Sequence, residues 1–283
     1  MKLNKKTVAI VASILIIGAT IVTKSIKSNT EAAEKAATAT ADSITYDLRI
    51  ATLPTLDALP FYIAEKNGAF DSLGLKVQLL MMNAQFDCDT ALLGGTIDAV
   101  LMDQVRQAKY EAEGKQFCSL HNISTPLSLV ISKDLGTQKV QDLRNHTLAI
   151  SRQSADISFA EQIFKIYGLK NDEVHYPQIN DLRLRTTMLT HRQVDAAILP
   201  EPMATMAQLN GHHILYKGAV PTSGTNQLVF KADSQCKDKL SALADAYMKA
   251  KAELDKKKLA DYRSLLITKF NIPEAVVDTL ITR

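Results

Sequence analysis

The chain contains no tryptophan, and it has only three cysteines among its 283 residues. Cys88, Cys118 and Cys236 are widely spaced and form no Cys-x-x-Cys pair, so the sequence gives no support to a structural zinc site. One disulfide and three buried thiols both remain open, and we favour buried thiols. The absence of tryptophan and the aromatic content of 6% leave few rings for stacking against a ligand.

The chain also lacks a strong net charge. Its formal charge is +3, but residues 1–41 hold six of the lysines and only two glutamates, so the remainder is near neutral. No extended basic face is needed to explain the composition, which argues against nucleic-acid binding. A hydrophobic content of 46% with 22% charged residues is typical of a globular protein, and the length favours about two domains.

Residues 1–27 have the pattern of an export segment. Three lysines precede an uncharged apolar run from Thr7 to Thr23, and two more follow it. The run is short for a membrane span but longer than the apolar region of a signal peptide, so we favour a retained anchor over a cleaved signal. Residues 28–45, rich in Ala, Thr, Glu and Lys, are expected to be a tether. The leading lysines place the rest of the chain outside the cytoplasm.

One phrase occurs twice, as GTIDAV at 95–100 and as RQVDAAIL at 192–199. Each copy follows a helix-like run and starts a short apolar strand that ends at polar residues or proline. The repetition predicts two similar half-molecules with a cleft between them. We expect Asp98 and Asp195, which open the two strands, to cap turns rather than to act in catalysis.

From Tyr46 onward, strand and helix patterns alternate, which predicts an α/β fold. The strands are expected at 46–50, 76–82, 99–102, 127–132, 147–150, 174–178, 196–199 and 228–231. The helices are expected at 60–67, around 91–93, and at 104–113, 157–167, 182–190, 201–209 and within 236–283. The runs 127–132 and 228–231 would carry the chain to a second lobe and back. Lobe 1 is therefore predicted at 46–126 and 224–283, with the C-terminal helices packed on it, and lobe 2 at 127–223.

In open α/β sheets, ligands bind beyond the carboxyl ends of the strands, where helix N-termini present unpaired N–H groups. The loops at those positions supply hydroxyl, amide, carboxylate, guanidinium and aromatic groups. The candidate ligand-binding residues are Thr55, Asp57, Phe86, Asp87, Asp103, Gln104, Ser124, Ser151, Arg152, Ser154 and Glu201.

Many of these candidates also have a structural interpretation, because Asp, Glu and Ser are favoured at helix N-caps and in first turns. We favour N-cap roles for Asp57 and Asp87 and leave the others open. Arg152 suits a carboxylate or sulfonate, or else is a solvated loop residue. The candidate carboxylates outnumber it, so if two of them face the cleft, an amine-bearing or heteroaromatic ligand is favoured over an inorganic anion. His212 and His213 lack a second ligand motif, and no metal or cofactor is expected.

Four stretches carry a resemblance to a known family. They are LPFYIAEKNGAFDSLGLKVQLL (59–80), DTALLGGTIDAVLMD (89–103), VQDLRNHTLAIS (140–151) and RTTMLTHRQVDAAILPEP (185–202). In this order they resemble extracytoplasmic solute-binding proteins of ABC importers, more narrowly the NMT1-like nitrate, sulfonate, taurine and thiamine-precursor group. The resemblance covers residues 49–280. It implies a two-lobe Venus-flytrap fold (type II periplasmic binding protein) that closes over one small molecule, such as a sulfonate or an aminopyrimidine, and delivers it to a permease and its ATPase.

Two alternatives remain beside this expectation. Thiamine-pyrimidine synthases and menaquinone-pathway dehydratases have similar folds, but the sequence shows no clustered cysteines, no Gly-x-Ser-x-Gly elbow, no phosphate-binding glycine loop and no His-Glu-x-x-His. A membrane-tethered ligand sensor would use the same cleft. We expect a monomeric binding protein without catalytic residues, and we argue its function from the site, because a fold alone does not fix function.

Overall fold

The computed structural model describes residues 45–136, 139–218 and 225–282. From Tyr46 on, the chain forms one compact unit. The predicted anchor at 1–27 lies outside the described residues, as does all of the predicted tether except Thr45. Within the described ranges, no helix combines the length and the apolar composition that crossing a bilayer requires.

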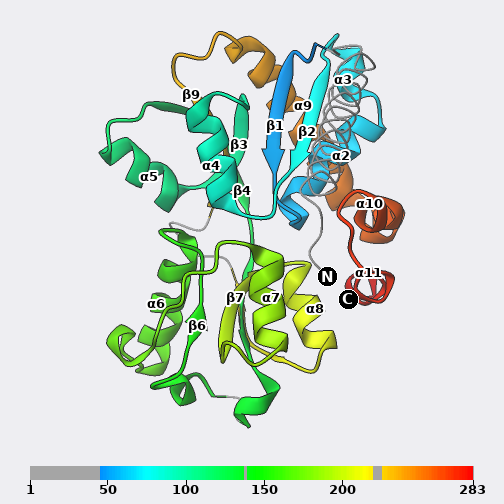
Figure 1. The fold of residues 1–283 in the computed structure, drawn as a ribbon. Helices are drawn as coiled ribbons and strands as arrows, with labels where there is room; N and C mark the ends of the chain where they lie inside the picture. The colour runs from blue at the N-terminus through cyan, green and yellow to red at the C-terminus, as the bar shows by residue number, and fades with distance from the viewer. Residues whose placement is uncertain (1–44, 137–138, 219–224, 283) are drawn as a thin grey trace, which may run out of the picture. The chain divides into compact units, whose positions relative to one another are not determined.

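The unit contains two separate sheets, each with its own helices, which we call the first and second lobes (Figure 1). In spatial order, the first sheet consists of β2 (Val77–Met81), β1 (Leu48–Thr52), β3 (Ala99–Asp103), β9 (Thr225–Lys231) and β4 (Phe117–Ser124). Strands β2, β1 and β3 run parallel, whereas β9 lies antiparallel between β3 and β4. The parallel strands therefore present their carboxyl ends at one edge of the sheet.

Helices connect the parallel strands of the first lobe, as the alternating pattern predicts. They are η1 (Leu56–Ala58), α2 (Leu59–Lys66), α3 (Ala69–Ser72), α4 (Gln85–Gly94) and α5 (Gln104–Ala112). Gly68 follows α2 with a φ of 69°, and Gly95 follows α4 with a φ of 76°. Both stops need the left-handed conformation that glycine adopts without strain, and this fixes where the chain turns back into the sheet.

The second sheet is smaller and again mixes parallel and antiparallel pairs. Its order is β6 (Leu148–Ala149), β7 (Ala196–Pro200), β5 (Leu127–Ile131) and β8 (His213–Gly218). The helical segments are η2 (Lys133–Leu135), η3 (Val140–Leu143), α6 (Ala155–Tyr167), η4 (Asn171–Glu173), α7 (Leu182–Thr190) and α8 (Met203–Leu209). Strands β5 and β7 are buried along their whole length, as expected for continuous apolar runs.

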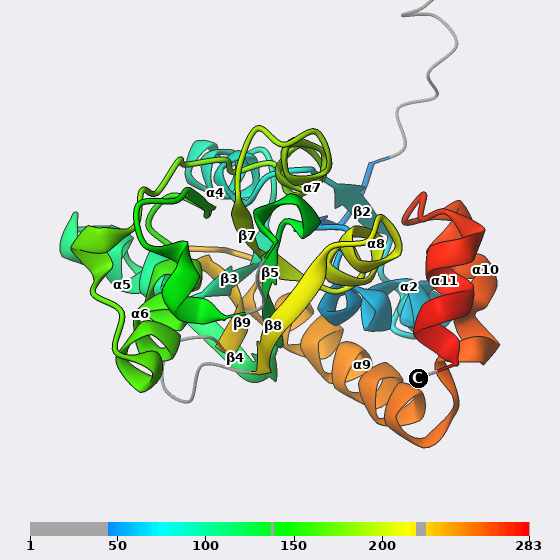
Figure 2. The ribbon, with the colours of Figure 1, turned by 90° about the horizontal axis from the view of Figure 1, so that it is seen from below.

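The C-terminal segment contains α9 (Lys237–Lys256), η5 (Leu259–Tyr262), α10 (Arg263–Thr268) and α11 (Glu274–Ile281). As predicted, α9 packs on the first lobe, where the rings of Tyr247 and Phe61 lie 4.6 Å apart. The sequence prediction placed all of the C-terminal helices on lobe 1. In the structure, however, α11 packs against α8 of the second lobe (Figures 1 and 2). Arg183 of α7 also donates to the carbonyl of Phe270 at 2.5 Å. The C-terminal helices therefore contact both lobes.

Three parts of the fold differ from the sequence prediction. The antiparallel strands β4 and β8 were not predicted, and both have half-buried or exposed residues along most of their length. The predicted strand 174–178 forms only isolated bridges through His175 and Gln178. Pro177 lies inside this segment, and proline has no N–H to donate to a neighbouring strand, so a regular ladder does not form there.

The repeated Asp-Ala phrase has the same structural role in both lobes. Asp98 accepts a hydrogen bond from the backbone N–H of Arg49 at 2.7 Å, just where β1 begins. Asp195 accepts from the backbone N–H of Thr147 at 2.9 Å, directly before β6, and from the hydroxyl of the same residue at 2.8 Å. Each aspartate thus joins its own strand to the neighbouring parallel strand.

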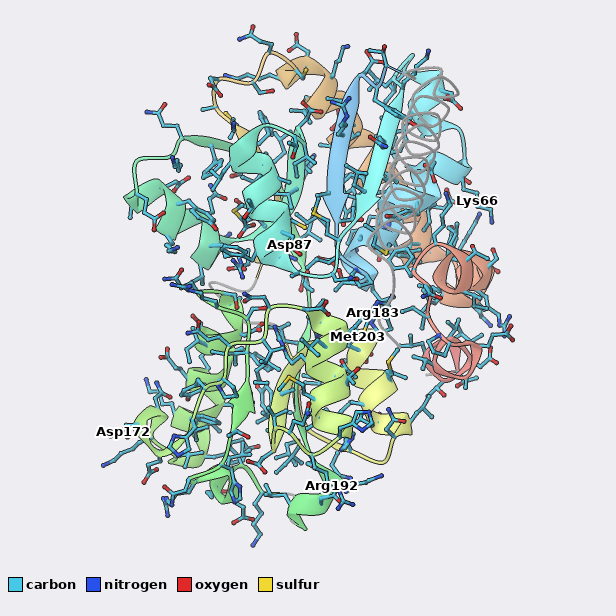
Figure 3. All side chains as sticks on the ribbon, viewed as in Figure 1. Lys66, Asp87, Asp172, Arg183, Arg192 and Met203 are labelled. Carbon is cyan, nitrogen blue, oxygen red and sulfur yellow. The ribbon has the colours of Figure 1, made fainter. Side chains whose placement is uncertain are left out.

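We expect Asp195→Ala to lower the free energy of unfolding by about 1–2 kcal/mol, because it removes an acceptor from two donors at the start of β6. Urea unfolding followed by circular dichroism at 222 nm measures this change. Asp172→Ala is the matched control: Asp172 is exposed on η4 at the outer edge of the second lobe (Figure 3). The control is expected to stay within about 0.5 kcal/mol of the wild type. Equal effects of the two substitutions would contradict the assigned role.

Candidate functional site

A cavity lies between the two lobes at the carboxyl ends of their parallel strands. It has a volume of about 640 Å³, which includes open solvent at its mouth. Leu53, Thr55 and Asp103 line it from the first lobe, and Ser151 and Asp156 from the second. Both lobes therefore supply polar groups and apolar walls to one space.

The structure brings together five of the predicted site residues in this cavity. They are Thr55, Asp57, Asp103, Ser151 and Ser154. Ser124 and Glu201 line a neighbouring cavity of about 720 Å³, whose wall also includes Asp57. Glu201 forms an ion pair there with Lys217 at 2.8 Å. Its carboxylate is therefore already paired within the protein.

The other four predicted residues are all described, and none of them lines either cavity. Helix α4 begins at Gln85 with Ala84 as its N-cap, so the N-cap role predicted for Asp87 is wrong. Phe86 and Asp87 lie exposed in the first turn of α4, and the side chain of Phe86 does not form a wall of the cleft. Gln104 is half-buried at the start of α5, and Arg152 is exposed.

In the first lobe, a buried guanidinium joins two carboxylates. Arg106 of α5 donates from Nη1 to Asp89 Oδ2 at 2.8 Å, and its Nε lies 3.5 Å from Asp103 Oδ2. Asp89 also accepts from Gln85 at 3.0 Å and from Tyr110 at 3.2 Å. Asp103 is the N-cap of α5 and accepts from the backbone N–H of Arg106 at 3.1 Å. The structure thus confirms a capping role for Asp103 and also places it in the cavity wall.

Burial raises the pKa of Asp103 to about 7, and the nearby carboxylates of Asp156 and Asp89 raise it further in the same direction, while Arg106 opposes them. Burial also raises the pKa of Asp89. The effect of Asp156 on Asp103 acts across the cleft, because the two residues belong to different lobes. Closing the lobes therefore brings two negative charges towards each other.

In the second lobe, Arg185 of α7 organises the loop after β6. Its guanidinium is fully buried and donates to Asp156 Oδ2 at 2.7 Å, to the carbonyl of Ile198 at 2.6 Å and to that of Ile179 at 2.9 Å. It also donates to the hydroxyl of Ser151. Asp156 in turn accepts from the backbone N–H of Ser151 at 2.7 Å. Ser154 caps α6, so it is both an N-cap and part of the cavity wall.

Asp57 connects the cavity to the first segment that joins the sheets and to the start of β9. Its Oδ2 accepts from Thr125 at 2.8 Å and from Asn226 at 2.6 Å, and Asn226 also donates to Thr125 at 3.0 Å. Thr125 lies between β4 and β5, and Asn226 lies in β9. Asp57 Oδ1 is buried and accepts no hydrogen bond within the described part of the chain. The predicted N-cap role for Asp57 is wrong, because it lies within η1, whose N-cap is Thr55.

Backbone contacts close the space between the lobes. Leu182, the first residue of α7, donates its N–H to the carbonyl of Asn83 at 3.2 Å, beside a bridge between Ala84 and Asp181. Leu56 of the first lobe donates its N–H to the carbonyl of Glu201 at 3.2 Å. These contacts link residues of different lobes directly.

The chemistry of this site is that of a binding pocket with fixed polar groups. Among the described residues, no group of three or more His, Cys, Asp or Glu is arranged to hold a metal ion. The guanidinium of Arg185 already has a protein acceptor for each of its three nitrogens. Arg106 differs, because its buried Nη2 has no hydrogen-bond partner among the described residues. In the cavity wall, Asp57 Oδ1 and the Arg106 nitrogens Nε and Nη2 are thus buried without a hydrogen-bond partner among the described residues.

Sequence reasoning missed several residues of the cavity and its support, namely Gln85, Asp89, Arg106, Thr125, Asp156, Arg185 and Asn226. The spacing of residues in the sequence could have identified the two buried arginines, Arg185 and Arg106. Arg185 occupies the same helical face as the buried Leu182 and Leu189, at spacings of three and four residues. Arg106 lies three residues after Asp103, the spacing of an ion pair at a helix start. No comparable signal marks Asn226, because its role depends on the meeting of three distant segments.

The sequence is similar to one known family. A family model described as NMT1/THI5 like matches residues 55–253. No curated protein matches the sequence.

Solved structures similar to this fold include three from bacteria. The alkanesulfonate-binding protein SsuA of Xanthomonas axonopodis pv. citri, bound to MOPS, has a TM-score of 0.70 at 16% identity, covering 83% of each chain. The ligand-binding component of an ABC-type import system from Staphylococcus aureus, with zinc bound, has a TM-score of 0.69 at 16% identity and the same coverage. The periplasmic aliphatic sulphonate binding protein SsuA of Escherichia coli has a TM-score of 0.66 at 16% identity, covering 82% of this chain and 81% of its own. The fold is thus the two-lobe fold of periplasmic binding proteins.

The raised pKa of Asp103 predicts how stability depends on pH. Its pKa is about 7 in the folded chain and 3.8 as the reference value, so between these pH values the native state binds more protons than the unfolded state. The free energy of unfolding therefore falls as pH rises through this window, by about 1 kcal/mol or more. We expect Asp103→Asn to remove this fall while retaining the N-cap.

Urea unfolding at pH 5 and at pH 8 measures this change in the free energy of unfolding for the wild type, for Asp103→Asn and for a control variant, Asp87→Asn. Asp87→Asn is the control, because Asp87 is an exposed aspartate outside the cavity wall. It is expected to keep the wild-type pH dependence. An Asp103→Asn variant with an unchanged slope would show that Asp103 is ionised throughout this range.

Proposed function

Because the chain belongs to the NMT1/THI5-like family, whose model covers residues 55–253, we propose that it is the solute-binding component of an ABC importer. It captures a small organic nutrient between its lobes and delivers it to a permease that is driven by an ATPase. The observation that carries the proposal is the cavity itself, because residues of both lobes line one space at the carboxyl ends of their strands.

The same proposal places the protein outside the cytoplasm. The segment 1–27 exports the chain and either stays as an anchor or is cleaved as a signal, and residues 28–45 act as the tether. The periplasmic location of sulfonate-binding proteins with this fold supports the placement. Domain boundaries at 126/127 and 223/224 belong to the proposal as well, and the change of sheet between Ser124 and Leu127 supports the first of them.

Capture works through a shift between open and closed lobes. A solute that contacts both lobes binds the closed form more tightly, so it moves the equilibrium towards closure by its difference in affinity. Asp57 is suited to transmit this change, because it lines the cavity and is hydrogen-bonded to Thr125, which lies between the two sheets, and to Asn226 near the start of β9. A permease that recognises the closed form then receives only loaded protein.

The amide of Leu182 gives a direct test of closure. As the first residue of α7, Leu182 has no partner for its N–H within the helix, and the structure gives it the carbonyl of Asn83 in the other lobe. We expect a bound solute to slow hydrogen exchange at this amide up to about a hundredfold at a hundredfold excess over its dissociation constant. NMR exchange on the full chain measures it, with taurine, methanesulfonate, an aminopyrimidine, ethanolamine and choline as probes.

The matched control is the amide of Leu184, two residues further along the same helix. It donates to Asp181 Oδ1 at 2.9 Å within one lobe, so closure should leave its exchange unchanged. Mass spectrometry of the recovered probe completes the experiment. A probe recovered intact supports a transport receptor, whereas a probe converted to product would assign the chain to the enzymes of this fold. Binding without any change at Leu182 would contradict capture by closure.

A further inference from the structure

The charges around the cavity do not balance. The charged side chains that line it, or bond to those that do, are Asp57, Asp89, Asp103, Asp156, Arg106 and Arg185. Carboxylates thus outnumber guanidinium groups by four to two within the described part of the chain. All six residues are at least nine-tenths buried, and buried charge is costly unless an opposite charge compensates it. The cavity and its support therefore hold more acidic than basic side chains.

Two helix N-termini that could attract an anion are already occupied by the protein. Helix N-termini at the carboxyl ends of strands form ready anion sites, because their N–H groups are unpaired. Here the carboxylate of Asp103 accepts from an N–H of α5. At α6, Ser154 caps the helix and the carboxylate of Asp156 lies in its first turn. A sulfonate or carboxylate placed at either helix start would therefore lie beside a carboxylate of the protein.

One acceptor in the cavity has no partner. Asp57 Oδ1 is buried, while Oδ2 of the same carboxylate already accepts from Thr125 and Asn226. An unpaired carboxylate oxygen in a buried wall needs a donor, preferably a charged one. Arg106 supplies the complementary feature, because it lines the same cavity and its buried Nη2 donates to no acceptor among the described residues.

We propose that the solute is a small organic cation, a protonated amine or quaternary ammonium compound that also carries an oxygen acceptor. Its positive group lies near Asp57, between Asp103 of the first lobe and Asp156 of the second, and its oxygen accepts from Arg106. The assignment rests on the proposed solute-binding function. It explains how closure tolerates Asp103 and Asp156 at opposite sides of one cavity, since a cation between them replaces their repulsion by attraction. Burial is the main cause of the raised pKa of Asp103, and the carboxylate of Asp156 adds to it in the same direction.

Compounds that share a two-carbon chain but differ in charge distinguish a cationic solute from a zwitterionic or an anionic one. Ethanolamine is a cation, taurine a zwitterion and isethionate an anion, and choline and methanesulfonate extend the two ends of the series. Each is added to the full chain at about 10 mM, which populates a site of millimolar dissociation constant. Circular dichroism at 222 nm follows the unfolding midpoint, because the chain has no tryptophan for fluorescence. Exchange at the Leu182 amide reports closure in the same samples.

We expect ethanolamine or choline to raise the midpoint and to protect Leu182, and isethionate and methanesulfonate to do neither. Asp57→Asn and Asp103→Asn should each weaken binding of the cation by about tenfold or more, since each removes a charge that attracts it. Asp103→Asn keeps its N-cap, so it remains informative if Asp57→Asn does not fold. Asp87→Asn, exposed on α4 at the end nearest the second lobe (Figure 3), is the control and should change affinity less than about twofold.

The outcomes distinguish this inference from the function on which it rests. Closure around isethionate, taurine or methanesulfonate without closure around either cation would overturn the cation assignment and leave the binding function intact. No response to ethanolamine or choline at this concentration would also overturn it. Conversion of a bound probe to product would instead contradict the proposed function itself.

Discussion

Two buried guanidinium groups hold the loops from which the cleft is built. Arg185 reaches from α7 to the loop after β6 and binds Asp156, Ser151 and two backbone carbonyls there. Arg106 reaches from α5 to Asp89 at the base of α4. Removing one partner of such a pair leaves an uncompensated buried charge, at a cost of about 3–5 kcal/mol. These arginines therefore fix the positions of the polar groups in the cavity wall before any solute arrives.

The alternation of apolar runs and helix signals was enough to predict most of the fold. Helix α7 and strands β5 and β7 lie where the pattern placed them, because long buried runs leave little choice of structure. The failures concern segments whose structure depends on partners far away in the sequence. Strand β4 contains polar His121 and Asn122 and pairs only with β9, about a hundred residues later. Its identity is set by this pairing rather than by its own pattern.

The candidate site was predicted in outline, because the rule that ligands bind at strand carboxyl ends identifies the correct loops. It does not say which side chains point inwards. A shift of a helix start by two or three residues was enough to turn Phe86 and Asp87 from cleft residues into exposed residues of the first turn of α4. The arginines were missed for a different reason. A charged residue within a helix is usually solvated, and only the packing of α5 and α7 shows that these two are buried.

The fold and the polarity of its cleft are separate properties. Parallel strands followed by helices place several N–H-bearing helix N-termini around one space, which by itself favours anions. In this chain Asp103 caps α5, Ser154 caps α6 with Asp156 in its first turn, and Arg106 and Arg185 are paired with the two aspartates. Similarity of fold at 16% identity therefore carries the architecture of the cleft, while the sign of its charge is set by a few side chains.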